Sequence, residues 1–231
     1  MKRAVIVLIL GGMLCTCAYS QQKPFVFGFK VGPTFGWMKP ESKDFESTGM
    51  SVGYTWGFIA DFFLMENYGI CTGFDVVNLN AGLKMPATIK NEGGEELDGT
   101  LDRKYKLKYI QIPVVFKMQT KELGKFRIFG QLGMGTDFLI GAKADDEFTS
   151  ESGETISDDN VDIYDEMTFM RVALILGAGV DFNLGGSTNL LAGITYNNGF
   201  MNILTGNNSY DPTTVNKAKA NYLALELGIV F

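Results

Sequence analysis

The chain ends in the stretch Tyr222-Leu223-Ala224-Leu225-Glu226-Leu227-Gly228-Ile229-Val230-Phe231, and this stretch decides the fold class. Every second residue from Leu223 to Phe231 is a large apolar one, whereas Ala224, Glu226 and Gly228 between them are small or charged. Side chains that alternate in this way lie on opposite faces of a β-strand, because a helix would repeat every three to four residues. The stretch therefore predicts a strand with one apolar face.

The same alternation recurs along the chain, and we predict eight strands from it. Pro33 and Pro113 fall inside two of them and cannot donate a backbone hydrogen bond, so we expect a bulge at each proline. The predicted strands span 25–37, 51–64, 68–80, 104–118, 125–140, 168–183, 188–200 and 219–231.

The predicted connections alternate strictly between long and short. The long ones are 38–50, 81–103, 141–167 and 201–218, and the short ones are 65–67, 119–124 and 184–187. Outer-membrane barrels show this asymmetry, with long loops outside the cell and short turns in the periplasm. A spanning strand needs only about 10 residues, which these strands supply. The sequence thus predicts an all-β, eight-stranded antiparallel transmembrane up-and-down β-barrel with both ends in the periplasm.

The N-terminus resembles an export signal. Lys2 and Arg3 precede the apolar run 4–14, and Ala18-Tyr19-Ser20 offers the small residues that a signal peptidase prefers. We therefore predict a signal peptide at 1–20 and a single outer-membrane barrel domain at 21–231.

Two alternatives at the N-terminus are a retained membrane anchor and lipid attachment at Cys15 or Cys17. The apolar run is short for a membrane span, and the residues before either cysteine lack the usual small-residue pattern. Cleavage at the predicted site leaves Cys71 as the one cysteine, which excludes an internal disulfide framework.

The two faces of the predicted strands differ in charge. The apolar face is dense in large aromatic residues, whereas the other face is rich in glycine and carries charges of both signs. Such charges can pair inside a small barrel, but they would be very costly against lipid. We therefore expect the apolar face to contact the outer membrane of a Gram-negative cell; the alternative is a soluble, lipocalin-like barrel with an apolar interior. The predicted lumen charges are Lys30, Asp61, Asp75, Lys117, Arg127, Asp137, Arg171, Asp181 and Glu226.

Aromatic residues near the predicted strand ends are typical of the girdles that anchor barrels at both membrane interfaces. A sugar-binding platform is the alternative interpretation. These residues are Trp37, Tyr54, Trp56, Tyr68, Tyr105 and Tyr109.

Five segments in the same order resemble the PorT-like outer-membrane barrel family of Bacteroidota. They are Phe27–Thr34 (FGFKVGPT), Leu107–Val114 (LKYIQIPV), Phe129–Gly133 (FGQLG), Ala192–Ile203 (AGITYNNGFMNI) and Leu225–Phe231 (LELGIVF). The resemblance covers most of the predicted mature chain and implies an eight-stranded, porin-like barrel. The founding member of that family is an accessory of type IX protein secretion, so the resemblance also implies an accessory role there.

The chain contains no histidine. This excludes Ser-His and Cys-His nucleophile pairs, the imidazole general base and histidine-based zinc sites. A carboxylate pair among the lumen residues could still transfer protons, which leaves a carboxylate enzyme as an alternative. We predict a protein that is not an enzyme and that needs no cofactor.

The segment 141–167 is strongly acidic and is opposed only by Lys143. It is either a solvated surface loop, a calcium site, or a docking site for a basic partner or for divalent-bridged lipopolysaccharide. Asp158, Asn160 and Asp162 match the first spacings of an EF-hand, but Ile163 and Phe169 occupy the positions that need glycine and glutamate. These three residues are therefore the candidate metal ligands, outside any EF-hand.

The predicted function is that of a structural or accessory barrel of the outer membrane. An eight-stranded barrel leaves little or no aqueous channel. Its expected partners are outer-membrane lipid and lipopolysaccharide, and envelope or secretion proteins that contact the long loops; the net charge of −6 argues against nucleic acid. The alternative is a small-solute pore or ligand-binding barrel, with Lys30, Arg127 and Arg171 lining the path.

Overall fold

The computed structural model describes residues 25–90 and 93–231. The predicted signal peptide at 1–20 lies outside the described residues. In chain order the elements are β1 (Phe25–Pro40), β2 (Glu46–Met65), β3 (Tyr68–Lys90), β4 (Glu96–Gln119), β5 (Phe126–Ser150), β6 (Thr155–Asp162), the 3-10 helix η1 (Tyr164–Glu166), β7 (Met170–Gly185), β8 (Thr188–Gly199) and β9 (Ala218–Val230). Within the described ranges, no helix has the length and apolar character needed to cross a membrane.

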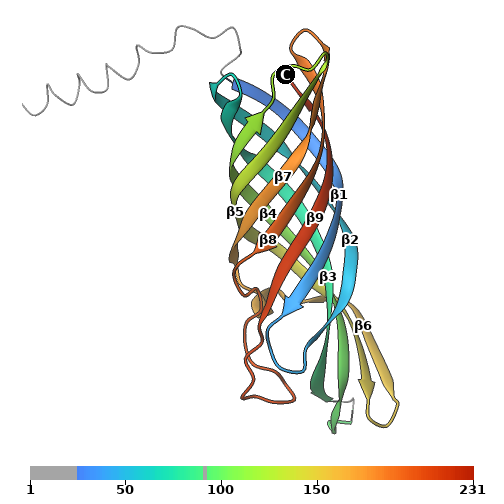
Figure 1. Ribbon diagram of the computed structural model, residues 1–231. Helices are drawn as coiled ribbons and strands as arrows, with labels where there is room; N and C mark the ends of the chain where they lie inside the picture. The colour runs from blue at the N-terminus through green and yellow to red at the C-terminus, as the bar shows by residue number, and fades with distance from the viewer. Residues whose placement is uncertain (1–24, 91–92) are drawn as a thin grey trace, which may run out of the picture.

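Eight of the strands close into a ring in the order β1-β2-β3-β4-β5-β7-β8-β9, and β9 pairs again with β1 (Figure 1). Every pairing in the ring is antiparallel and joins strands that follow one another around the barrel. The predicted up-and-down barrel is therefore confirmed. The additional strand, β6, pairs with the far end of β5 and lies outside the ring.

The two ends of the barrel differ. The short turns after β2, β4 and β7 lie at the same end as the C-terminus, where the Phe231 N–H donates to the Phe27 carbonyl at 2.8 Å (Figure 1). The connections after β1, β3 and β8, and the segment between β5 and β7, lie at the opposite end. We call these the short-turn end and the long-connection end.

The apolar residues point outward. Phe29 is 59% exposed, Val31 56% and Leu227 60%, whereas the charged Asp137 and Arg171 are 0% exposed inside the ring. An interior of buried charges and an exterior of aliphatic and aromatic side chains fit a barrel in lipid. The soluble, lipocalin-like alternative is therefore wrong. We call this outer surface the apolar band.

Two predicted long loops, 81–103 and 141–167, are wrong. β3 and β4 remain paired up to Lys90 and Glu96, and β5 continues to Ser150 before it turns back into β6. Alternation continues through these segments, but the outward positions become polar at Asn78 and Lys108 because the sheet has left the lipid. We call 78–90, 96–108, 141–150 and β6 together the sheet extension; it projects beyond the barrel in Figure 1.

The bulges predicted at Pro33 and Pro113 are absent. Pro33 pairs with Tyr54 and Pro113 with Gly135, and the register is the same on both sides of each proline. A missing N–H removes one ladder hydrogen bond but does not by itself insert a residue. One bulge lies instead in β5, where Ile140 is the extra residue opposite Lys108 and Tyr109, on the boundary of the apolar band.

The predicted aromatic girdle is correct only in part. Trp56, Tyr54 and Tyr68 are exposed on the outer surface. Tyr105 and Tyr109 are 3% and 0% exposed, because both occupy inward positions of β4 and help to fill the lumen.

Because the outer face of the barrel contacts lipid, an arginine introduced on the outer face of β4 should destabilise the protein only within the apolar band. Val114 lies in the middle of the outward row of this strand and is 57% exposed, whereas Thr100 lies on the same face beyond the apolar band. Val114→Arg should lower the free energy of unfolding by about 2–4 kcal/mol. Thr100→Arg should change it by less than about 0.5 kcal/mol. Urea titration of both variants folded in lipid vesicles measures this, and equal effects would contradict the lipid-facing assignment.

Candidate functional site

The predicted lumen charges occupy inward positions of their strands. Eight of them form three groups of ion pairs spaced along the barrel, and the ninth, Arg127, pairs at the rim. Each group lies where an inward lysine or arginine meets carboxylates from other strands, because strand alternation directs these side chains into one narrow interior.

The first group lies near the short-turn end. The Lys117 ammonium is 2.8 Å from Asp61 and 3.5 Å from Asp181, and all three side chains are at most 10% exposed. Arg127 does not join this group; its guanidinium lies 3.5 Å from Glu122 in the adjoining turn and is about one third exposed. Arg127 therefore belongs to the rim of the barrel.

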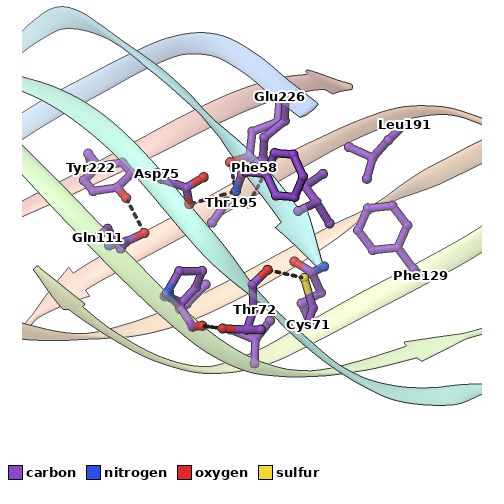
Figure 2. A pocket seen from close by; sticks show the side chains of 16 residues that line it. Phe58, Cys71, Thr72, Asp75, Gln111, Phe129, Leu191, Thr195, Tyr222 and Glu226 are labelled. Carbon is purple, nitrogen blue, oxygen red and sulfur yellow. Dashed lines mark hydrogen bonds and ion pairs between the residues drawn. The ribbon is translucent and has the colours of Figure 1, made fainter. Parts of the chain in front are cut away.

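The second group lies around Lys30. Its ammonium is 3.0 Å from both Asp75 and Glu226, and the Thr195 hydroxyl donates to the second oxygen of Glu226 at 3.0 Å. Figure 2 shows Asp75, Thr195 and Glu226 gathered at one side of an internal cavity, with Phe129 and Leu191 at the other. The cavity measures about 30 Å³. That is room for one or two water molecules, not for a solute.

The third group lies around Arg171. Its Nε contacts the Asp137 carboxylate at 2.5 Å, its Nη1 donates to the Ala220 carbonyl at 2.8 Å, and its Nη2 donates to Asn197 at 3.0 Å. The guanidinium carbon lies 5.1 Å from the ring centre of Tyr109. These contacts satisfy a fully buried cation, which would otherwise be very costly in this interior.

Two neutral side chains complete the third group. Gln111 donates to the other oxygen of Asp137 at 2.6 Å and accepts a hydrogen bond from the Tyr222 hydroxyl at 3.1 Å. Sequence reasoning missed Gln111, Tyr222 and Asn197 because it searched for charges. Their inward position in predicted strands was the signal that could have identified them.

An apolar core closes the lumen between Arg171 and the long-connection end. Its fully buried members come from the sheet extension, from β5 and from the connections that fold over the barrel mouth. They are Leu79, Leu83, Leu107, Leu139, Ile163 and Ile203. The lumen is thus filled by ion pairs near the short-turn end and in the middle, and by aliphatic side chains at its mouth.

The acidic segment 141–167 is folded onto the cations of β4. Asp146 accepts two hydrogen bonds from Arg103, each of 2.7 Å, and Asp145 lies 2.6 Å from the Lys106 ammonium. The prediction that 141–167 is a loop is therefore wrong, because most of it is paired strand, although its tip and most of β6 are exposed to solvent.

All three candidate metal ligands lie on β6. Asn160 accepts a hydrogen bond from Lys106 at 3.3 Å, and Asp162 accepts one from the Tyr164 N–H at 3.0 Å. Asp158 pairs in register with Asp146. Across residues 25–90 and 93–231, no cluster of three or more Asp, Glu, Cys or His side chains is arranged to hold a metal ion.

Each lumen carboxylate contacts a lysine or an arginine. Asp61 and Asp181 contact Lys117, and Asp137 contacts Arg171. A carboxylate held in this way neutralises the neighbouring cation inside the barrel. The arrangement offers structural charge pairing and gives no positive sign of catalysis.

The third group predicts an asymmetric response to mutation. Arg171→Leu leaves Asp137 buried without its cation and should lower the free energy of unfolding by about 3–5 kcal/mol. The outward Leu174→Ala on the same strand should cost about 1–2 kcal/mol. Adding Asp137→Leu to Arg171→Leu should recover most of the loss. Urea titration in lipid vesicles measures all three, and equal losses in the two single variants would contradict a stabilising role of the pair.

Several solved structures are similar to this chain. Neisserial surface protein A (NspA) has a TM-score of 0.51 at 10% identity, over 90% of this chain and 96% of that one. OprG of Pseudomonas aeruginosa has a TM-score of 0.47 at 13% identity, over 91% and 97%. Ail, the attachment invasion locus protein of Yersinia pestis, has a TM-score of 0.40 at 15% identity, over 90% and 100%. At these identities the likeness to NspA shows the fold alone.

A comparison with curated proteins gave no match. The family model described as "Outer membrane protein beta-barrel domain" matches residues 19–224, which is most of the chain. The match agrees with the apolar exterior, the closed ring and the predicted location in the outer membrane, which is thereby confirmed. The chain belongs to the outer membrane protein beta-barrel domain family.

Proposed function

We propose that this barrel is a closed, non-enzymatic scaffold that presents the sheet extension outside the cell. The observation that carries the proposal is the filled lumen: Arg171, Lys117 and Tyr109 are all at most 2% exposed inside the ring. A solute could pass only if several buried ion pairs separated at once, and separating each of them is costly.

The sheet extension supplies the surface for such a role. β3 and β4 stay paired for about half of their length beyond the apolar band, and β6 adds a further strand to β5. Ordered sheet outside the membrane offers a rigid surface, which costs less entropy on binding than a flexible loop.

A finer proposal follows from the five segments that resemble the PorT-like family. In that case the scaffold serves type IX protein secretion and contacts other envelope proteins through the sheet extension. This finer proposal rests on the sequence resemblance alone.

Conductance tests whether the lumen is closed. In planar bilayers the wild-type protein should give no conductance steps, with an open porin as the positive control. The triple variant Lys30→Ala/Asp75→Ala/Glu226→Ala removes the second ion-pair group and should also remain closed, because the Lys117 and Arg171 groups block the path on both sides. Regular steps from the wild-type barrel would favour the pore alternative.

Deletion and complementation test the secretion role. A deletion strain should export fewer type IX substrates, and the full-length chain should restore export. A chain in which an Asn-Gly turn replaces 87–99, between the paired Pro86 and Thr100, should fold but fail to restore export. Normal export in the deletion strain would contradict the secretion role. The proposal of a closed scaffold would not be affected, because the conductance measurement tests it separately.

A further inference from the structure

The outward side chains of β4 change from basic to aliphatic within one step of the strand. Lys104, Lys106 and Lys108 precede Ile110 and Ile112 on the same face, and all three lysines are exposed. The neighbouring strand changes at the same level, because Asn78 pairs with Lys108 and Val76 with Ile110. This level is therefore the edge of the apolar band.

This edge lies on the outer-leaflet side of the membrane. The short turns and the C-terminus share the opposite end of the barrel, and in outer-membrane barrels short turns face the periplasm. The lysines of β4 are thus placed at the level of the headgroups of the outer leaflet, where lipopolysaccharide is the characteristic lipid.

A groove of about 380 Å³ lies at this edge, on the outer side of β4 and β5. Its basic residues are Lys106, Lys108 and Lys143, and its floor includes Ile140. Asp162 and Tyr164 also line it, next to the end of β6. We call it the lysine groove; its volume lies within the usual range for small-molecule sites.

A bulge in β5 builds the floor of the lysine groove. Tyr109 pairs with Leu139 and Lys108 with Gly141, so Ile140 is an extra residue without a partner in β4. Its side chain is 46% exposed. A bulge changes the direction in which a side chain points. This one places an aliphatic side chain next to the lysines, on the side of the apolar band.

Two of the three lysines are free to bind an anion. Lys106 is engaged by Asp145 at 2.6 Å and by Asn160 at 3.3 Å. The hydrogen bond from Lys106, together with one from the Asn160 N–H, lowers the pKa of Asp145, which therefore stays ionised. Within residues 25–90 and 93–231, Lys108 and Lys143 have no ion-pair partner.

The lysine groove also contains one carboxylate, that of Asp162. It accepts a hydrogen bond from the Tyr164 N–H at 3.0 Å, and although Asp162 pairs in register with Lys143, the two side chains do not form an ion pair. Three ammonium groups against Asp162 and the adjacent Asp145 leave a positive balance.

We propose that the lysine groove binds a phosphorylated glycolipid of the outer leaflet, the lipid A part of lipopolysaccharide. A phosphate lies between Lys108 and Lys143, where charge-assisted hydrogen bonds to lysine are strong. An acyl chain of the same molecule runs down over Ile140 and Ile112 on the apolar band. An amphiphile fits both halves of this surface, whereas a free phosphate would use only the lysines.

The test is a titration of the purified, folded barrel in non-ionic detergent with bisphosphorylated lipid A, followed by native mass spectrometry. Lys108→Gln/Lys143→Gln should weaken binding by on the order of tenfold to thirtyfold, because each lysine near a lipid phosphate contributes about threefold to fivefold. The matched control is Lys121→Gln/Lys125→Gln, which removes two exposed lysines from the short turn between β4 and β5. This control should bind like the wild type.

Three results would overturn the proposal. They are equal binding by the Lys108→Gln/Lys143→Gln variant and the wild type, equal binding of lipid A that lacks both phosphates, and tighter binding of inorganic pyrophosphate or of a polyglutamate peptide than of lipid A. Both lysines point to solvent, so the variant should keep the wild-type shift between boiled and unboiled samples on a gel. If that shift is lost, the test uses the wild-type protein alone. Its affinity for lipid A must then fall as the NaCl concentration rises, and an unchanged affinity overturns the proposal.

Discussion

The cost of placing a charge against hydrocarbon determines most of this structure. Inside the membrane every lysine, arginine, aspartate and glutamate of the ring must turn inward, and the outward positions must be free of charge. Alternation of the strands then sends Asp61, Lys117 and Arg171 into one narrow lumen, where only mutual pairing makes their burial tolerable. Where the constraint ends, at Lys108 on β4, charges appear at once on the outer face although the strand itself continues.

The lumen shows two solutions to the problem of filling a small barrel. Near the short-turn end and in the middle, lysines and carboxylates from distant strands neutralise each other, as Lys30 does with Asp75 and Glu226. Near the mouth, Leu83 and Ile203 pack as in the core of a soluble protein. The change coincides with the point where loops from the long-connection end can reach the axis and exclude water. Together the two parts fill most of the interior, apart from the small cavity beside Lys30.

Strand periodicity predicted the ring and its orientation because period-two alternation is a local property, visible in runs such as Phe25, Phe27 and Phe29. Periodicity does not predict the strand ends correctly where polar residues are taken as the boundary. The predicted strands end at Asn80 and begin at Lys104, because polar residues in a strand outside the lipid resemble loop residues. The sequence pattern also identifies the lumen charges but not Gln111 or Asn197, because the sequence does not show which hydrogen-bond partner a neutral side chain will have. Pairing partners depend on register between strands, and register is set by the whole ring.

The first and last strands close the ring, and this closure has a consequence for biogenesis. Gly28 pairs with Val230, and Lys30 contacts Glu226, which is 196 positions away in sequence. No part of the wall is complete before the C-terminal strand has crossed the inner membrane, so a nascent or truncated chain exposes two unpaired strand edges. Bringing such distant segments together is also slow. Until Val230 pairs with Gly28, both edge strands therefore present unpaired backbone groups to which another chain could pair.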